Sequence, residues 1–224
     1  MKISAFLTAA TALILCSAQT IGADTLARWP PKQTVVLYNQ NSNFGRGVVS
    51  DNFSSAMSSY DAIGADDFWV PAGQTWQITE VDVTGAYVDG TGPASSVVVT
   101  FWVGDAYPRR IVHHRDDSFT LSCTDNEGSF ACTLPVNSRG RPVVRLRGGS
   151  GGTPYWLSVV ANCDFINCGE WNWTTNTTVY ASQAAWKNPG GGWGTPCEGW
   201  GVLSACFGTA ADLAFTLIGF KKGS

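Results

Sequence analysis

Hydrophobic and polar residues alternate in many short segments of this chain, and the alternation predicts β-strands. The clearest case is Thr153–Asn162 (TPYWLSVVAN), which places Tyr155 and Leu157 on one face and Trp156 and Ser158 on the other. A run of glycines precedes this segment and a loop bounded by two cysteines follows it. We therefore expect a central strand with a turn at each end.

Further strands are expected where β-branched and aromatic residues gather between turn residues. They are residues 34–38, 65–70, 74–88, 96–104, 111–114, 118–123, 130–134, 142–147, 170–175, 183–187 and 212–220. A slip in the alternation at Glu80 predicts a β-bulge. The segments 118–123 and 130–134 are interpreted as one hairpin, and the polar residues 39–59 as a long loop that has room for a short turn of helix.

Helical periodicity is missing outside the N-terminal segment, while turn residues recur throughout the chain. This pattern predicts an all-β fold, an antiparallel two-sheet β-sandwich of jelly-roll type that is braced by disulfides. Residues 24–64 are expected to add a strand and a long loop to the same domain, whose main part is the β-sandwich module at 65–220. Residues 221–224 are a short tail.

The N-terminus has the pattern of a signal peptide. Lys2 is followed by an uncharged apolar stretch, residues 3–16, and by the small residues that a cleavage site after Ala23 needs. The apolar stretch is short for a bilayer span, and no later segment predicts one. The expectation is a signal peptide at 1–23 and a secreted, extracellular protein, with the periplasm and the cell surface as alternatives.

Six of the seven cysteines lie in the predicted mature chain, and an even number in an exported protein indicates disulfides. Cysteines that are consecutive in the sequence flank turn-rich segments, so the Cα atoms of two such cysteines can approach each other without long-range rearrangement of the chain. The predicted bridges are Cys123–Cys132, Cys163–Cys168 and Cys197–Cys206. A metal site is disfavoured, because there is no C-x-x-C spacing and no histidine near these cysteines.

The formal net charge of −3 and the predicted export argue against nucleic acid as a partner. The densest cationic stretch is RGRPVVRLR at 139–147, where alternation places Arg145 and Arg147 on one strand face. Two readings stay open: a solvated face, or a contact for an anionic polymer.

Catalytic motifs are weak in this sequence. Ser150 formally sits in G-x-S-x-G, but a strand follows it and both histidines, His113 and His114, precede it. Adjacent strand residues point to opposite faces, so the two histidines are not expected to act together. The acidic pairs, Asp66-Asp67 among them, could serve a hydrolase only if the fold brings two carboxyl groups together across a cleft.

Tryptophan is the most informative residue type, with ten in the chain and five between positions 171 and 200. Indole rings in loops can stack on sugar rings or anchor a protein partner, but buried tryptophan is common, and periodicity does not separate binding from packing in a core. The candidate ligand-binding residues are Trp171, Trp173, Trp186, Trp193 and Trp200. Asn172 begins an N-glycosylation motif; if it is glycosylated and faces solvent, its two tryptophan neighbours point inward.

Several stretches resemble one known type of module: ADDFWVPAGQTWQITEVDV, PYWLSVVAN, EWNWTT, AAWKNPGGGWGTPC and DLAFTLIG. They are similar to an uncharacterised β-sandwich module that recurs in secreted bacterial proteins, often beside proteases, adhesins or anchoring signals. The resemblance spans about residues 65–219. It implies a β-sandwich fold and a secreted setting, and it implies no catalytic residues.

The sequence thus favours a secreted, non-catalytic binding or adhesion module for carbohydrate or another cell-surface ligand. The alternatives are a structural or envelope module that binds other proteins, and a secreted hydrolase that uses scattered carboxylates. No cofactor is expected. The alternative is a structural Ca²⁺ ion bound by Asp66 and Asp67.

Overall fold

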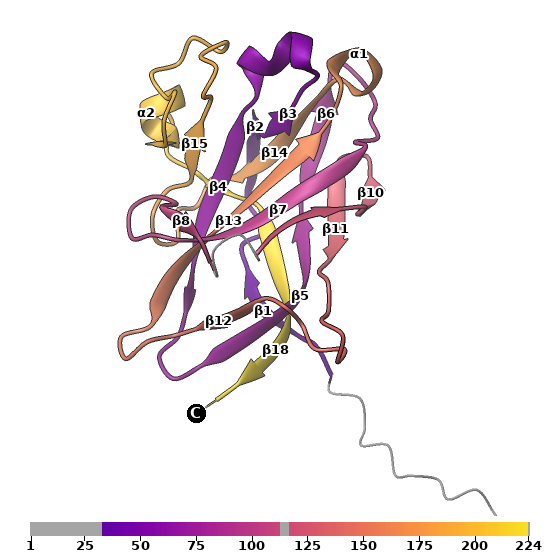
Figure 1. Cartoon of the computed structure of the whole chain (residues 1–224). Coiled ribbons are helices and arrows are strands. Elements are labelled where there is room, and N and C mark those ends of the chain that lie inside the picture. Colours follow the sequence, from indigo (N-terminus) through magenta and orange to yellow (C-terminus); the bar gives the residue numbers. More distant parts are fainter. Residues whose placement is uncertain (1–32, 113–116, 224) are drawn as a thin grey trace, which may run out of the picture. The chain divides into compact units, whose positions relative to one another are not determined.

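The alternating segments pair into antiparallel sheets in a computed structural model that describes residues 33–112 and 117–223 (Figure 1). The described residues belong to one compact unit. The predicted signal peptide, residues 24–32 and both histidines lie outside the described residues.

Three sheets contain the named strands of the described part. The six-stranded sheet has the order β1 (Val35–Asn39), β18 (Phe215–Lys222), β5 (Thr75–Val83), β11 (Ser129–Thr133), β10 (Thr124–Asn126), with β12 (Arg145–Arg147) also paired to β5. The eight-stranded sheet has the order β16 (Gly201–Val202), β15 (Ala185–Lys187), β4 (Ile63–Val70), β13 (Thr153–Asn162), β7 (Ser96–Val103), β8 (Arg110–Ile111), with β3 (Asp51–Asn52) on β13 and β9 (Ser118–Leu121) on β7. The four-stranded sheet has the order β17 (Asp212–Leu213), β14 (Glu170–Asn176), β2 (Phe44–Val49), with β6 (Gly85–Val88) on β14.

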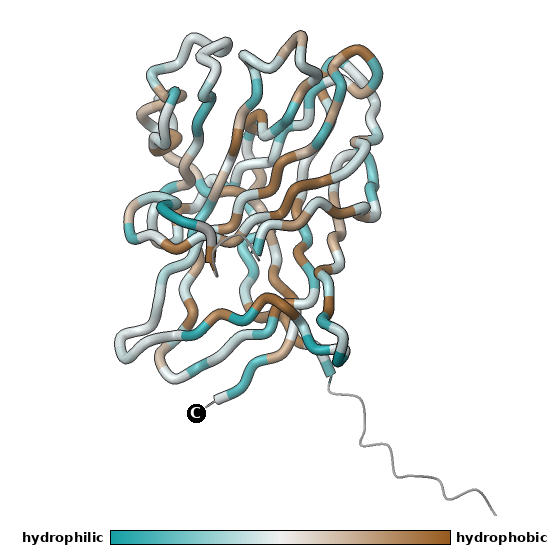
Figure 2. Tube along the Cα trace, in the orientation of Figure 1, coloured by the Kyte–Doolittle hydropathy of each residue, from teal (hydrophilic) through white to brown (hydrophobic). Residues whose placement is uncertain are grey.

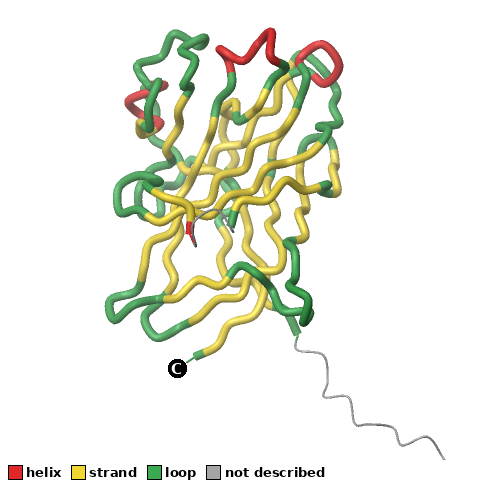
Figure 3. The backbone as a smooth tube through the Cα atoms, in the orientation of Figure 1, coloured by secondary structure: helices red, strands yellow, loops and turns green. Residues whose placement is uncertain are grey.

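Helix is scarce in the described chain, and its named elements are three short pieces (Figure 3). They are the 3₁₀ segment η1 (Ser55–Tyr60) and the helices α1 (Phe165–Cys168) and α2 (Leu203–Phe207). Among the named strands of the described residues, every pair is antiparallel except β3 with β13. The prediction of an all-β, antiparallel, disulfide-braced fold is confirmed, whereas the jelly-roll topology stays a prediction.

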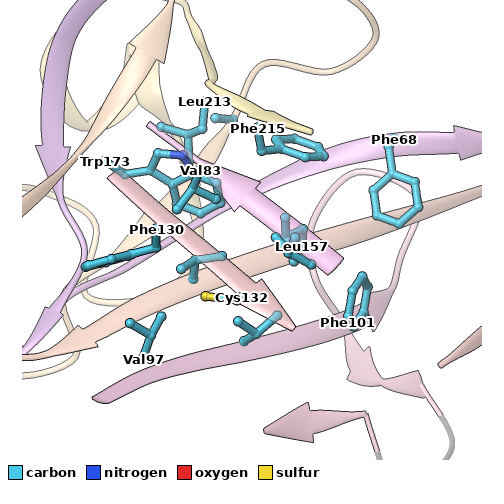
Figure 4. Close-up of a cluster of buried hydrophobic side chains, with 14 of the residues drawn as sticks. Phe68, Val83, Val97, Phe101, Phe130, Cys132, Leu157, Trp173, Leu213 and Phe215 are labelled. Carbon is cyan, nitrogen blue, oxygen red and sulfur yellow. The ribbon is translucent and has the colours of Figure 1, made fainter. Parts of the chain in front are cut away.

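Aromatic contacts show which sheets face each other. Phe68 of β4 stacks on Trp76 of β5, with ring centroids 6.2 Å apart, and meets Phe215 of β18 edge-on at 6.2 Å. Trp171 of β14 stacks on Phe130 of β11 at 4.9 Å. The six-stranded sheet therefore packs against both of the others, and their inward side chains form a common core with a sandwich-like arrangement (Figure 4).

The strand β13 is central, as its alternation predicts. It pairs with β4 on one side and with β7 on the other. Leu157 points into the main core, while Trp156 joins Ala65 and Ala185 in a smaller cluster on the opposite face. Both faces of β13 are therefore covered by other parts of the chain. Figure 2 shows brown, hydrophobic stretches on the strands in the middle of the molecule.

The predicted bulge is confirmed at the β5–β18 pairing. Gly219 pairs with Ile78 and Ile218 pairs with Glu80, so Thr79 has no partner residue opposite it. The extra residue explains the slip in the alternation at Glu80, because side chains on the two sides of a bulge change phase.

Two sequence-based expectations are wrong. The long loop at 39–59 contains β2 and β3, whose pairing with β14 and β13 outweighs the low strand propensity of their Gly and Asp residues. The hairpin partner of β11 is β10 instead of residues 118–123, which form β9 on β7. Glu127 and Gly128 both have positive φ, at 54° and 95°, and such a tight two-residue turn joins only the strands directly beside it.

The three predicted disulfides are confirmed, Cys123–Cys132, Cys163–Cys168 and Cys197–Cys206. Such bonds persist in oxidising compartments, which agrees with an extracellular environment. No helix in the described part is long and apolar enough to span a bilayer.

Candidate functional site

Three of the five candidate tryptophans belong to the core. Trp171, Trp173 and Trp186 are all 0% exposed. Their indole N–H groups donate to backbone carbonyl oxygens, of Gly128 at 2.7 Å, Ala214 at 2.9 Å and Val49 at 2.7 Å respectively. The three rings are buried and their N–H groups already have acceptors, so these residues offer no face to a ligand. Their prediction as ligand-binding residues is therefore wrong.

The glycosylation motif anticipates this result for β14. Asn172 is half-buried on the outer face, while Trp171 and Trp173 point inward from the same strand. The inward position of the two rings is shown by the structure, whereas glycosylation of Asn172 stays a prediction.

Trp200 lies apart from the core and from the other candidates. Its ring meets Trp102 edge-on at 6.0 Å, and Lys187 Nζ stands 4.7 Å from its centroid. Burial lowers the pKa of Lys187. The half-buried indole of Trp200 thus packs on the smaller cluster, with a cation over its ring.

Trp193 is the candidate that borders open space. Its indole N–H donates to the carbonyl oxygen of Tyr60 at 2.7 Å, and its ring meets the Tyr60 ring edge-on at 5.5 Å. The backbone of its glycine-rich loop is tied to η1, since Gly192 N–H donates to Ser59 O at 2.9 Å. Asn188 Oδ1 accepts the Trp193 backbone N–H at 3.1 Å. These contacts fix the ring while leaving it half-buried.

A groove of about 720 Å³ lies beside this ring, and we call it the Trp193 groove. Its floor comes from the outer face of the four-stranded sheet and its wall from Trp193 and the segment around α2. The lining residues are Gly45, Arg46, Gly47, Val48, Val49, Glu170, Asn172, Thr175, Thr177, Trp193, Leu203, Phe207, Thr209, Ala210 and Ala211.

The floor of the Trp193 groove is polar and lies close to the backbone. Asn172 Nδ2 donates to Glu170 Oε1 at 2.7 Å, which orients both side chains. Gly47 lets Asn172 lie close against β2, because a Cβ at position 47 would come within 2.7 Å of the Asn172 Cβ. A ligand can therefore approach amide, carboxylate and hydroxyl groups at the same surface.

The wall of the groove is apolar and rests on the core. Phe207, 44% exposed, meets the buried Trp186 ring edge-on at 4.8 Å. The helix α2 that carries Phe207 is tied to the preceding loop by the Cys197–Cys206 bridge. Two aromatic rings, those of Trp193 and Phe207, thus border a polar floor, a combination found in pockets that bind small ligands.

Asp66, Asp67 and Asp125 accept hydrogen bonds that hold the fold together. Asp66 is 0% exposed and accepts hydrogen bonds from Gln40 Nε2 and from the backbone N–H of Leu213. Asp67 accepts the N–H of Ser182 at 3.2 Å, and Asp125 accepts the N–H of Gly128 at 2.8 Å in the β10–β11 turn. Within the described residues, no group of three or more His, Cys, Asp or Glu side chains is arranged to hold a metal ion.

The other weak motif gains no support. Ser150 lies in the exposed turn before β13, in an isolated bridge between Ser150 and Gly152. A strand follows it, where a nucleophile elbow requires a helix.

Comparison with protein-family models, with curated proteins and with solved structures finds no significant match for this chain.

Sequence reasoning found Trp193 but missed most of the Trp193 groove. Residues 45–49 were assigned to a loop, and Phe207 was not singled out. The sequence does mark the two elements, because each begins and ends with a hydrophobic residue. These residues are Phe44 and Val49 in β2, and Leu203 and Phe207 in α2. No pattern in the sequence shows that these two segments lie on either side of one groove.

Proposed function

We propose that this protein is a secreted, non-catalytic carbohydrate-binding module that holds a sugar in the Trp193 groove. The observation that carries the proposal is the position of Trp193, fixed through Tyr60 beside a polar floor. Flat apolar faces complement the C–H faces of a sugar ring, and amide, carboxylate and hydroxyl groups complement its hydroxyls.

The size and location of the groove support the same function. A volume of about 720 Å³ lies within the range of small-ligand pockets, about 300–1,000 Å³. The groove lies on disulfide-supported elements, and rigid sites lose less conformational entropy on binding. Three disulfides also suit a protein that meets its ligand outside the cell.

A glycan array, followed by titration of the best sugar, tests the proposal. Trp193→Ala is expected to weaken binding by about tenfold or more, since stacked aromatic residues dominate such sites. Phe207→Ala, an exposed position on the groove wall, is expected to weaken binding without loss of the fold. Trp200→Ala is the matched control and is expected to bind as the unmodified protein does.

Two results would overturn the proposal. One is retention of no neutral or acidic glycan by the folded protein. The other is binding that survives both Trp193→Ala and Phe207→Ala but is lost in Trp200→Ala, which would place the ligand over the smaller cluster instead.

A further inference from the structure

A second cavity, of about 820 Å³, lies between the edge strand β12 of the six-stranded sheet and the strands β7, β8 and β9 of the eight-stranded sheet. It shares no lining residue with the Trp193 groove. Three of its lining side chains are arginines, Arg110, Arg145 and Arg147. We call it the arginine cavity.

The arginines are held on well-anchored backbone. Leu146, 0% exposed, points into the core between them, so Arg145 and Arg147 both project outward from β12. Tyr155 of β13 pins this strand from the other sheet: its hydroxyl donates to Arg147 O at 3.0 Å and lies 3.2 Å from Arg147 N. Arg110 approaches from β8, where it pairs with Val103.

Charge in the arginine cavity is unbalanced. All three arginines are exposed, and none of their guanidinium groups forms an ion pair or hydrogen bond with another described residue. The one carboxylate among the described lining residues belongs to Asp117, which is 1% exposed, so the guanidinium groups outnumber it three to one. In a chain of net charge −3, this is a local excess of positive charge in a concave site, where the field is focused.

The floor of the cavity adds apolar surface. Val112 and Tyr155 are 5% and 8% exposed, and Phe119 of β9 is half-buried beside them. A ligand that fits must therefore offer both an apolar face and several oxyanions within reach of guanidinium groups. Guanidinium forks bind carboxylate and sulfate groups through paired hydrogen bonds.

We propose that the arginine cavity is a second binding site, for an acidic oligosaccharide that carries carboxylate or sulfate groups. Such a ligand combines C–H faces with oxyanions, and it is common outside the cell, a setting with which the three disulfides agree. The site does not depend on the Trp193 groove: either can be present without the other.

Binding to immobilised heparin and to polygalacturonate tests the inference, with dextran as the neutral probe. Heparin supplies sulfate and carboxylate groups, whereas polygalacturonate supplies carboxylate alone, so the two arms distinguish the oxyanions. The double variant Arg145→Gln/Arg147→Gln is expected to lose about tenfold or more in affinity for the preferred acidic probe. Affinity for dextran is expected to stay unchanged.

The matched control is Arg139→Gln/Arg141→Gln. It removes the same charge from exposed positions in the preceding turn that do not line the cavity, and it is expected to change affinity by less than about threefold. If both double variants lost the same affinity for the acidic probe, the binding would come from general attraction between charges, and the proposal would be overturned. Failure of the unmodified protein to bind either acidic probe at about 0.15 M salt would also overturn it.

Trp193→Ala is expected to leave the affinity for the acidic probes unchanged, which separates this site from the Trp193 groove.

Discussion

The side-chain amide of Gln40 donates to Asp66 Oδ2 at 2.5 Å, although the two residues are 26 positions apart. Tyr38, on β1, donates its hydroxyl to Gln40 Oε1 at 2.6 Å, and the backbone N–H of Leu213 donates to the same Asp66 oxygen. One buried chain of hydrogen bonds thus joins the edge of the six-stranded sheet, the strand β4 of the eight-stranded sheet and the strand β17 of the four-stranded sheet.

This junction concentrates acidic groups. Burial, followed by the nearby charge of Asp212, raises the pKa of Asp66 well above its usual range. Burial likewise raises the pKa of Asp212 to about 7, and that of Asp51, beneath β14, to about 8. The pKa of the Tyr38 hydroxyl is also raised, by burial and then by Asp66. The folded protein therefore holds protons on carboxyl groups that would be ionised in the unfolded chain.

We expect the protein to be most stable in mild acid. A carboxyl whose pKa is higher in the folded state stabilises fully below its unfolded pKa, near 4, and loses that contribution as pH rises through its folded pKa. The cited values for Asp212 and Asp51 place the loss between about pH 4 and pH 8. Urea unfolding across this range is expected to give a falling free energy of unfolding. A free energy that rises steadily from pH 4 to pH 8 would contradict this assignment.

Replacement of Asp212 by Asn tests one member of this group. Asp212 Oδ2 accepts the N–H of Tyr180 at 2.8 Å, while Oδ1 has no hydrogen-bond partner among the described residues. Asn keeps one acceptor and removes the buried charge, so we expect a gain of about 2–4 °C in the melting temperature at pH 8. At pH 4 the gain is expected to vanish. An equal shift at both pH values would show that ionisation of Asp212 is not involved.

Trp171→Ala is expected to lower the free energy of unfolding by about 3–5 kcal/mol. The substitution removes a fully buried ring that stacks on Phe130, and it leaves the carbonyl oxygen of Gly128 without its donor. Trp200→Ala, at a half-buried position, serves as the comparison and is expected to cost less. Chemical unfolding of both variants gives the two free energies of unfolding. A larger decrease for Trp200→Ala than for Trp171→Ala would contradict the assignment of Trp171 to the core.

Cys197→Ser/Cys206→Ser is expected to destabilise the protein by about 2–3 kcal/mol, because the bridge closes a loop with a sequence separation of 9. The double variant should also weaken sugar binding, since α2 and its Phe207 lose their tie to the loop that carries Trp193. Thermal unfolding gives the first quantity and sugar titration the second. Unchanged sugar affinity in the folded variant would show that the bridge does not organise the groove.

Strict alternation made much of the fold predictable. The boundaries of β13 and the bulge opposite Gly219 follow from local periodicity and from turn chemistry. Periodicity also places Trp171 and Trp173 on one face of β14, but it does not say that this face points inward. The disulfides follow from sequence proximity alone. These features are local, so neighbouring residues carry enough information to specify them.

Long-range packing set the limits of prediction. The strand β2 contains two glycines and an arginine, and only its pairing with β14 makes it a strand. Trp186 lies in a stretch rich in glycine and proline. Its ring nevertheless packs against Phe207 of α2, and its indole N–H donates a hydrogen bond to the carbonyl oxygen of Val49. The same long-range contacts build the Trp193 groove, so its location could not be deduced from the tryptophan pattern.

The central claim is that a sugar binds against Trp193, and the indole N–H signals of the protein test it most directly. The best sugar from the array would be titrated into tryptophan-labelled protein, followed by ¹H–¹⁵N spectra. The account predicts that the signal of Trp193, whose N–H donates to Tyr60, moves with the ligand while those of Trp171, Trp173 and Trp200 keep their positions. A titration that moves the Trp200 signal and leaves that of Trp193 in place would contradict it.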